Sequence, residues 1–171
     1  MFGFGKKKRS NTVESLTNQC IGGQSVLYRY FVEALKVHQN EIRKIELTYF
    51  SLAALTYVFL RMAKLENKEN IIDESCMAVF EKSLPNCGEA LRKDQLISEY
   101  QNRYKEYDAL LRHFFKKPGE VNSEACTSLL MHFYEKTMDK SAKDSMIQIL
   151  MATPLIEQYI LDNIDFIKTK F

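Results

Sequence analysis

The stretch TYFSLAALTYVFL, residues 48–60, decides what kind of fold this chain can adopt. It belongs to an uncharged window of about 14 residues between Glu46 and Arg61, whereas a helix needs ~20 mostly apolar residues to cross a bilayer. Apolar residues surround this segment on every side, so a helix formed here must be enclosed by other helices. We therefore predict a central buried helix rather than a membrane span.

The rest of the chain has the composition of a helical globular domain. Its 171 residues are 46% hydrophobic and 27% charged, with only six glycines and three prolines. A β-sandwich of this length would need many more turn residues. The other segments each carry one apolar stripe, as a layer of helices around a core would. We predict an all-α, single-domain bundle of about six to seven helices over residues 11–171, built around the central apolar helix.

Glycine and proline predict where helices end in the first half of the chain. A capping box formed by Asn11 and Glu14 should start a short helix. Gly22 and Gly23 should end that helix soon afterwards. Pro85 disfavours helical geometry in the residue before it, so another helix should end there.

The clearest helical pattern lies between Glu89 and Lys117. Apolar residues step by three and four along it and form a heptad-like seam of about two repeats. The members of this seam are Tyr100, Tyr104, Tyr107, Leu111 and Phe114. The sequence KKPG, residues 116–119, should end the helix.

Three further helices are predicted towards the C-terminus. One opens at Asn122 or the residue after it, and one spans residues 142–152. The last should begin at Thr153 and Pro154, because threonine can cap a helix and proline suits its first position. The apolar side of this last helix consists of Ile156, Ile160, Ile164 and Ile167.

Positive charge is concentrated at the N-terminus. Residues 6–9 supply four of the 24 basic residues, so the remainder carries 20 basic against 22 acidic residues, a net charge of −2. We predict a flexible basic tail over residues 1–10, for which contact with a partner or, weakly, with an anionic membrane surface is one interpretation. The residues that would make this contact are Phe2, Phe4, Lys6, Lys7, Lys8 and Arg9. A disordered, solubilising tail is the alternative, and a body without a basic face argues against a nucleic-acid partner.

The sequence contains no motif typical of catalysis or metal binding. The four cysteines form no Cys-x-x-Cys pair, and the three histidines form no Glu-x-x-His motif of a di-iron bundle. Neither a nucleophile elbow nor a phosphate-binding glycine loop is present. We therefore predict reduced, packed thiols in a cytoplasmic protein, with no cofactor, no metal and no catalytic residue.

Five tyrosines keep a ligand-binding interpretation open. Their hydroxyl groups would point into a pocket, or their rings would pack while the hydroxyl groups reach the surface. These residues are Tyr49, Tyr57, Tyr100, Tyr104 and Tyr107. The function predicted from these patterns is that of a non-enzymatic intracellular protein that binds another protein, or a second copy of itself, with the tail as an additional peripheral contact at the inner face of a membrane. The alternatives are a small-ligand-binding helical domain and, third, an enzyme whose site is assembled from dispersed residues.

Overall fold

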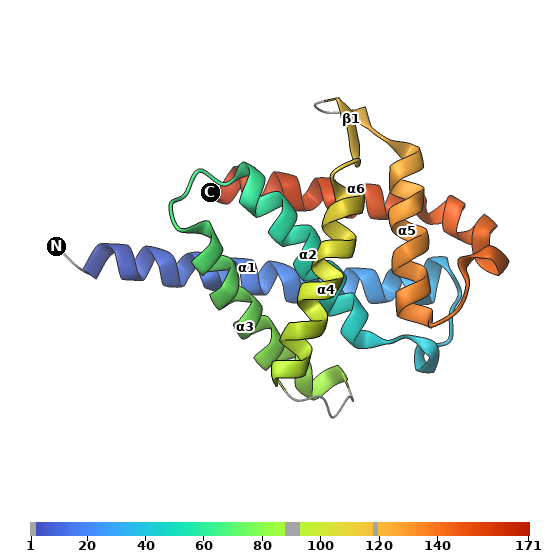
Figure 1. Ribbon diagram of the computed structural model, residues 1–171, viewed down its shortest axis with the longest axis horizontal. Coiled ribbons are helices and arrows are strands. Elements are labelled where there is room, and N and C mark those ends of the chain that lie inside the picture. Colours follow the sequence, from blue (N-terminus) through green and yellow to red (C-terminus); the bar gives the residue numbers. More distant parts are fainter. Residues whose placement is uncertain (1–2, 88–92, 118–119) are drawn as a thin grey trace.

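The computed structural model describes residues 3–87, 93–117 and 120–171, which form six α-helices and a small β-hairpin (Figure 1). The helices are α1 (Gly3–Arg29), α2 (Lys44–Met62), α3 (Lys68–Cys87), α4 (Lys93–Leu111), α5 (Ser123–Met138) and α6 (Met146–Lys170). The short helical turns are η1 (Tyr30–Ala34), η2 (Gln39–Glu41) and η3 (Ala142–Ser145), and the two strands of the hairpin are β1 (Phe115–Lys117) and β2 (Glu120–Val121). The predicted all-α bundle is confirmed.

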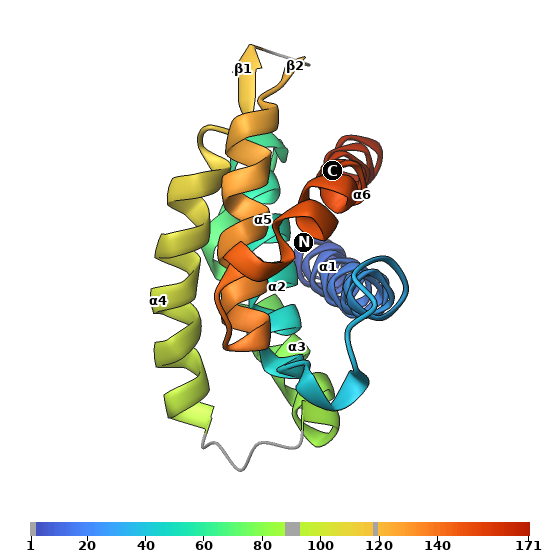
Figure 2. The same cartoon turned by 90° about the vertical axis from the view of Figure 1, so that its right-hand side faces the viewer.

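α2 is the central helix of this bundle. Each of the other five α-helices packs against it, and Figure 2 shows α2 in the middle of the molecule. Within residues 48–60 only Tyr57 and Leu60 are partly exposed. By length and composition α2 would be able to cross a membrane, but 78% of its apolar window is buried inside the bundle. The prediction of a central buried helix is confirmed.

Aromatic side chains fill the centre of the molecule around Phe50 of α2. The Phe50 ring stacks on Phe133 of α5, with ring centroids 4.0 Å apart. It meets Tyr107 of α4 edge-on at 5.1 Å and lies 6.1 Å from Tyr159 of α6. These rings join α2 to three helices that are distant in sequence, and aromatic pairs stabilise a core beyond the area that they bury.

α1 continues through the glycine pair that we expected to end it. A Cβ atom on Gly23 would lie 2.6 Å from the hydroxyl oxygen of Tyr159 and 2.8 Å from that of Ser51. Gly23 therefore allows α1 to approach α2 and α6 closely, and this packing holds a helix that glycine alone would weaken. The predicted break was wrong because the glycine serves a helix contact rather than a turn.

Alanine substitutions at the two neighbouring glycines should have opposite effects. Gly22→Ala should stabilise the protein by about 0.5–1 kcal/mol, because a Cβ there meets nothing within 4 Å and alanine favours helix. Gly23→Ala should destabilise it by about 1–3 kcal/mol, because the added methyl group overpacks the contact with Tyr159 and Ser51. Urea unfolding followed by circular dichroism measures both changes. Equal effects at the two positions would contradict the close approach.

Two prolines lie inside helices instead of at their ends. Pro85 falls in the last turn of α3, where it costs the one helix hydrogen bond that its missing N–H cannot donate, and the helix ends two residues later at Cys87. Pro154 lies on the exposed side of α6, where water can bond the carbonyl that loses its partner. The hydroxyl of Thr153 donates to the carbonyl of Ile149 at 3.1 Å instead of capping a new helix. The separate helix predicted over residues 142–152 was therefore wrong, since α6 is continuous.

The segment after α4 forms a β-hairpin that we did not predict. α4 ends at Leu111, and β1 pairs antiparallel with β2, with Phe115 opposite Val121 and Lys117 opposite Glu120. The aromatic and β-branched side chains of the first pair favour a strand over a continued helix. The predicted extension of the helix to Lys117 was wrong, and its predicted start near residue 89 lies outside the described residues. The apolar seam of this helix is buried, apart from one half-buried tyrosine.

The chain is helical from Gly3 onwards, so residues 3–10 are not the irregular tail that we expected. Lysine and arginine are good helix formers, and the segment contains no proline to interrupt the helix. Asn11 consequently lies inside α1 and does not start it as the predicted capping box required. At α5 the predicted start is confirmed, because the side chain of Asn122 accepts a hydrogen bond from the backbone N–H of Ala125.

Candidate functional site

Apolar side chains are exposed along one side of the first half of α6. Four large ones, which we call the α6 apolar face, keep about half or more of their surface exposed: Ile147 (72%), Leu150 (49%), Met151 (79%) and Leu155 (51%). Their spacing by three and four places them on one side of the helix. The only other large apolar side chain that is exposed in the described ranges is Val26 of α1, at 44%.

The first half of α6 is apolar on two sides. Ile149 and Ile156 are buried against the bundle, so the α6 apolar face is not needed to build the core. Further along the helix the outer side becomes polar, with Gln158 and Asp165 exposed. The inner side of this helix was predicted from the sequence, and the exposed outer side was not. The available signal was an excess of apolar residues over residues 146–156, more than a single buried stripe requires.

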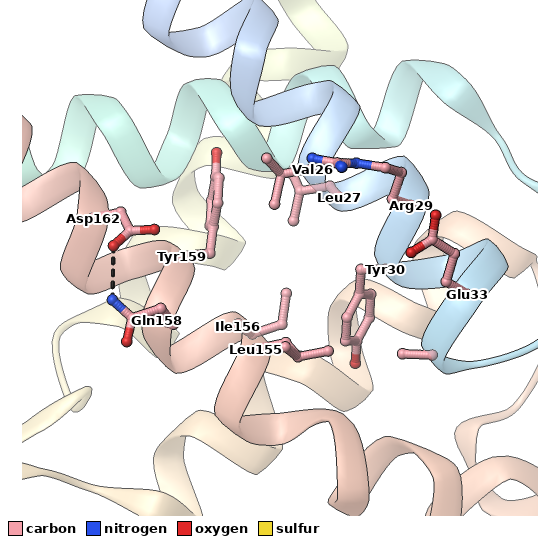
Figure 3. Close-up of a pocket in the computed structure, with 11 residues that line it drawn as sticks. Val26, Leu27, Arg29, Tyr30, Glu33, Leu155, Ile156, Gln158, Tyr159 and Asp162 are labelled. Carbon is pink, nitrogen blue, oxygen red and sulfur yellow. Dashed lines mark hydrogen bonds between the residues drawn. The ribbon is translucent and has the colours of Figure 1, made fainter.

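A pocket of about 260 Å³ lies beside the α6 apolar face, between α1 and α6 (Figure 3). We call it the α1–α6 pocket. Val26 and Leu27 extend into this space from α1, and Leu155 and Ile156 extend into it from α6. The polar members of the lining are Arg29, Glu33, Gln158 and Asp162. An apolar interior with charged groups among its lining is the usual composition of a site that receives a side chain or small group.

Two tyrosines also line the α1–α6 pocket, and they contribute mainly apolar surface. Tyr159 points its hydroxyl towards α2 (Figure 3) and donates a hydrogen bond to Ser51 Oγ at 2.9 Å. The hydroxyl of Tyr30 is buried and has no hydrogen-bond partner among the described residues. Burial raises the pKa of both tyrosines, so both remain neutral at physiological pH. The wall of the pocket that they form is therefore uncharged.

The five tyrosines that we predicted around a ligand pocket do not share one cavity. Tyr100 and Tyr104 do line a pocket, which lies between α2, α3 and α4 and has a volume of about 630 Å³. We call it the α3–α4 pocket. It lies apart from the α1–α6 pocket, and none of its lining residues comes from α1 or α6.

The other three predicted tyrosines serve packing and surface contacts. Tyr107 lies in the aromatic core, and its buried hydroxyl has no hydrogen-bond partner among the described residues. Tyr49 is buried and donates to Glu99 at 3.2 Å. Tyr57 is half-buried, and the guanidinium carbon of Arg61 lies 3.7 Å from the centroid of its ring. The rings of Tyr49 and Tyr107 are packed in the core, but the buried Tyr107 hydroxyl does not reach the surface as the alternative at the sequence level required.

The N-terminal tail lies at the far end of α1 from the α1–α6 pocket (Figure 1). Arg9 forms a side-chain ion pair with Glu74 of α3. The other predicted contact residues have side chains that lie outside the described part of the chain: Phe2, Phe4, Lys6, Lys7 and Lys8. One of the six predicted tail contacts is thus engaged by the protein's own bundle.

A charged network joins α2, α4 and α5. Arg103 Nε donates to both carboxylate oxygens of Glu46, at 3.0 and 3.1 Å, and the Glu46 side chain is only 1% exposed. Glu106 lies 3.3 Å from Arg103, 2.9 Å from His132 Nε2 and 3.3 Å from Lys136 Nζ. Burial raises the pKa of Glu46, while the guanidinium beside it favours the ionised form. These ion pairs and hydrogen bonds link side chains from α2, α4 and α5, so the network holds the three helices together.

The described cysteines behave as packed apolar side chains. Cys20, Cys76 and Cys126 are free and buried, and the side chain of Cys87 lies outside the described residues. Burial raises the pKa of the Cys20 and Cys76 thiols to about 12 and that of Cys126 to about 11. The reactive thiolate form is therefore scarce at neutral pH. Over the described ranges, no three histidine, cysteine or acidic side chains come together in a way that would hold a metal ion.

The fold and surface define an all-α bundle that presents an apolar helix face beside a small pocket. The chain matches no protein-family model, no curated protein and no solved structure.

Proposed function

We propose that this protein is a non-enzymatic binding protein, and that it binds another protein through the α6 apolar face and the neighbouring α1–α6 pocket. The observation that carries this proposal is the exposure of four large apolar side chains on two and a half turns of one helix. Single exposed apolar residues are normal on protein surfaces, but a contiguous group marks an interaction site.

The α1–α6 pocket beside the α6 apolar face supports a specific contact rather than nonspecific hydrophobic association. Interfaces draw most of their energy from a few apolar or aromatic side chains that fill desolvated pockets. A volume of about 260 Å³ accommodates one such side chain. Met151 is the most exposed member of the face, and methionine adapts its shape to a partner surface. The partner would lay a helix or a loop along α6 and place one apolar residue in the pocket.

The charged network argues against the enzyme alternative. Both oxygens of the Glu46 carboxylate accept from Arg103, and the side chain is almost completely buried. A general base must reach the substrate proton directly or through one water molecule. Glu46 lacks this access because its side chain is 1% exposed, so its role in this proposal is structural.

A photo-crosslinking experiment tests the protein-binding proposal. The crosslinking amino acid p-benzoylphenylalanine would replace Met151 in one variant and Asp165, an exposed residue on the polar half of α6, in a control. The Met151 variant should give an adduct of defined mass in cells, and the control should not. An adduct of twice the chain mass would identify a second copy as the partner.

The partner found in this way would then be purified for a binding measurement. Met151→Glu should weaken its affinity by about tenfold or more, because a buried carboxylate would have to be desolvated at the interface. Asp165→Asn should leave the affinity unchanged. Equal crosslinking at the two positions, or an affinity that does not respond to Met151→Glu, would contradict the proposal.

The basic tail is a second proposed contact, for an anionic membrane surface on the cytoplasmic side. The tail and the α6 apolar face lie towards opposite ends of α1 (Figure 1), whose 27 residues extend about 40 Å at 1.5 Å per residue. Both contacts can therefore be made at the same time. Buried, reduced thiols are consistent with a cytoplasmic location.

Replacing Lys6, Lys7 and Lys8 together with glutamine should abolish sedimentation with vesicles that contain phosphatidylserine. Each cation near such a surface contributes about 1 kcal/mol, so the three together account for about a hundredfold in binding. Arg9 is retained in this variant because it pairs with Glu74. Met151→Glu serves as the control and should sediment like the unmodified protein. Unchanged sedimentation of the glutamine variant would exclude the tail as a membrane contact.

A further inference from the structure

The α3–α4 pocket is larger than the α1–α6 pocket and is independent of the α6 apolar face. Its volume of about 630 Å³ falls within the range of small-molecule sites, roughly 300–1,000 Å³. α3 and α4 each pack on α2, and Figures 1 and 2 together show that they do not lie side by side along their lengths. The space between them is floored by Thr56 and Leu60 of α2.

The walls of the pocket are mainly apolar and aromatic. Residues spaced by three and four on the two helices face the same space. The principal members are Ile72, Met77 and Phe80 of α3 and Ile97, Tyr100 and Tyr104 of α4. A ligand that fills this pocket would therefore need an extended apolar group to lie between these side chains.

The floor of the pocket is polar but uncharged. The hydroxyl groups of Thr56 and Tyr100 lie 3.2 Å apart and share a hydrogen bond. Burial raises the pKa of Tyr100 well above its ordinary value and that of the neighbouring Cys76 thiol to about 12. Both groups therefore stay protonated at neutral pH, and neither offers a charge to a ligand.

The charged groups of the pocket are exposed and carry a net negative charge. Glu69 and Asp73 of α3 are one helical turn apart, and Lys105 of α4 is the single cation in the lining. Neither carboxylate has an ion-pair partner among the described residues. The neighbouring Lys68 is directed elsewhere, since it donates to the carbonyl of Leu60 at 2.6 Å. Two carboxylates against one cation favour a positively charged ligand group over a negatively charged one.

We propose that the α3–α4 pocket binds an amphiphilic organic cation. The apolar part would lie between Ile72, Phe80 and Ile97, and the cationic head would lie near Glu69 and Asp73. This ligand site is separate from the protein-binding role of α6, so either proposal can fail without the other.

Titration calorimetry of the full-length chain tests this proposal with three probes that carry the same ten-carbon tail. They are decyltrimethylammonium, decanoate and decyl maltoside, each used below its critical micelle concentration. The cation should bind one molecule per chain, and at least tenfold more tightly than decanoate. In the variant Glu69→Gln/Asp73→Asn the affinity for the cation should fall at least tenfold, while the affinity for the uncharged maltoside stays the same. Both substituted residues are exposed, so the variant should keep the fold and melting temperature of the unmodified protein.

Two further variants locate the binding. Ile97→Trp places a large side chain in the pocket and should abolish cation binding, whereas Met151→Glu on α6 should leave it unchanged. The proposal would be overturned by the absence of saturable binding, by equal affinity for the cation and decanoate, or by cation binding that does not respond to Glu69→Gln/Asp73→Asn. Loss of binding in Met151→Glu would place the probe on the α6 apolar face and would also overturn it.

Discussion

Replacing Arg103 with methionine should lower the free energy of unfolding by about 3–5 kcal/mol at pH 7, because it removes one partner of a buried ion pair. The Glu46 side chain is 1% exposed and accepts from Arg103 Nε through both carboxylate oxygens. Without the guanidinium a carboxylate would remain in a site with little water. Arg43, at 3.6 Å, and Lys136 also favour the ionised form of Glu46. The Arg43 side chain is 38% exposed and partly screened by solvent, so these cations compensate only in part.

The loss should depend on pH in a defined direction. In the Arg103→Met variant, Glu46 keeps its burial and loses the partner that favours ionisation, so its pKa in the folded protein rises further above the ordinary value of 4.5. Between the unfolded and the folded pKa the folded protein holds more protons than the unfolded chain. The free energy of unfolding therefore falls as pH rises through this interval. Urea unfolding at pH values from about 4 to 8 should show the smallest loss at the acidic end.

Two variants serve as controls for this prediction. Glu46→Gln/Arg103→Met lacks the buried carboxylate and should show no such pH dependence. Arg112→Met breaks an ion pair with Asp108 in which the arginine side chain is 64% exposed, and it should cost less than about 1 kcal/mol. A loss for Arg103→Met no larger than that for Arg112→Met would mean that Glu46 is not buried in solution.

Replacing Phe50 with alanine should have a comparably large effect, about 3–5 kcal/mol. The side chain is fully buried, stacks on Phe133 and meets Tyr107 edge-on. Its removal leaves a cavity where α2 contacts α4, α5 and α6, and the rigid rings around it cannot collapse to fill the space. A domain with a total stability of about 5–15 kcal/mol would lose a large part of it. Chemical denaturation measures the loss.

Phe115 supplies the matched control, since it is a half-buried phenylalanine in the hairpin at the edge of the bundle. Phe115→Ala should cost roughly 1 kcal/mol, in keeping with its partial burial. Phe50→Leu keeps most of the apolar volume and should be intermediate. If Phe50→Ala and Phe115→Ala cost the same, Phe50 is not at the centre of the core and α2 is not the central helix.

Features that depend on local chemistry could be predicted from the sequence. The uncharged window ending before Arg61 is shorter than a membrane span and apolar on all sides, so burial in a helical bundle followed directly. The start of α5 was predictable because the capping side chain of Asn122 lies next to the helix that it caps. The seam of α4 was predictable because its residues repeat by three and four.

Features that depend on distant partners could not be predicted in this way. Gly23 was predicted to break a helix. In the structure the side chain of Tyr159, which lies 136 residues later in the chain, occupies the place of the side chain that glycine lacks. Pro154 was predicted to start a helix, but it lies inside α6, on the side of the helix that faces solvent. At Gly23 tertiary packing overrode the propensity of the residue, and at Pro154 the solvent exposure of that side of α6 did so.

The candidate site divides in the same manner. The apolar excess in the first half of α6 is present in the sequence, but which of its side chains face the bundle depends on how α6 lies against α1 and α2. Likewise, Tyr100 and Tyr104 were identified as pocket residues from their type and spacing, whereas Tyr49, Tyr57 and Tyr107 shared that type and were placed elsewhere by packing.

The sequence by itself determined the helical class and the identity of the central helix, because composition and periodicity act over a few residues. Only the tertiary structure decided which apolar side chains remain exposed on α6 and which space stays open between α3 and α4, because these depend on the distances between helices, and those are set by side chains far apart in the chain.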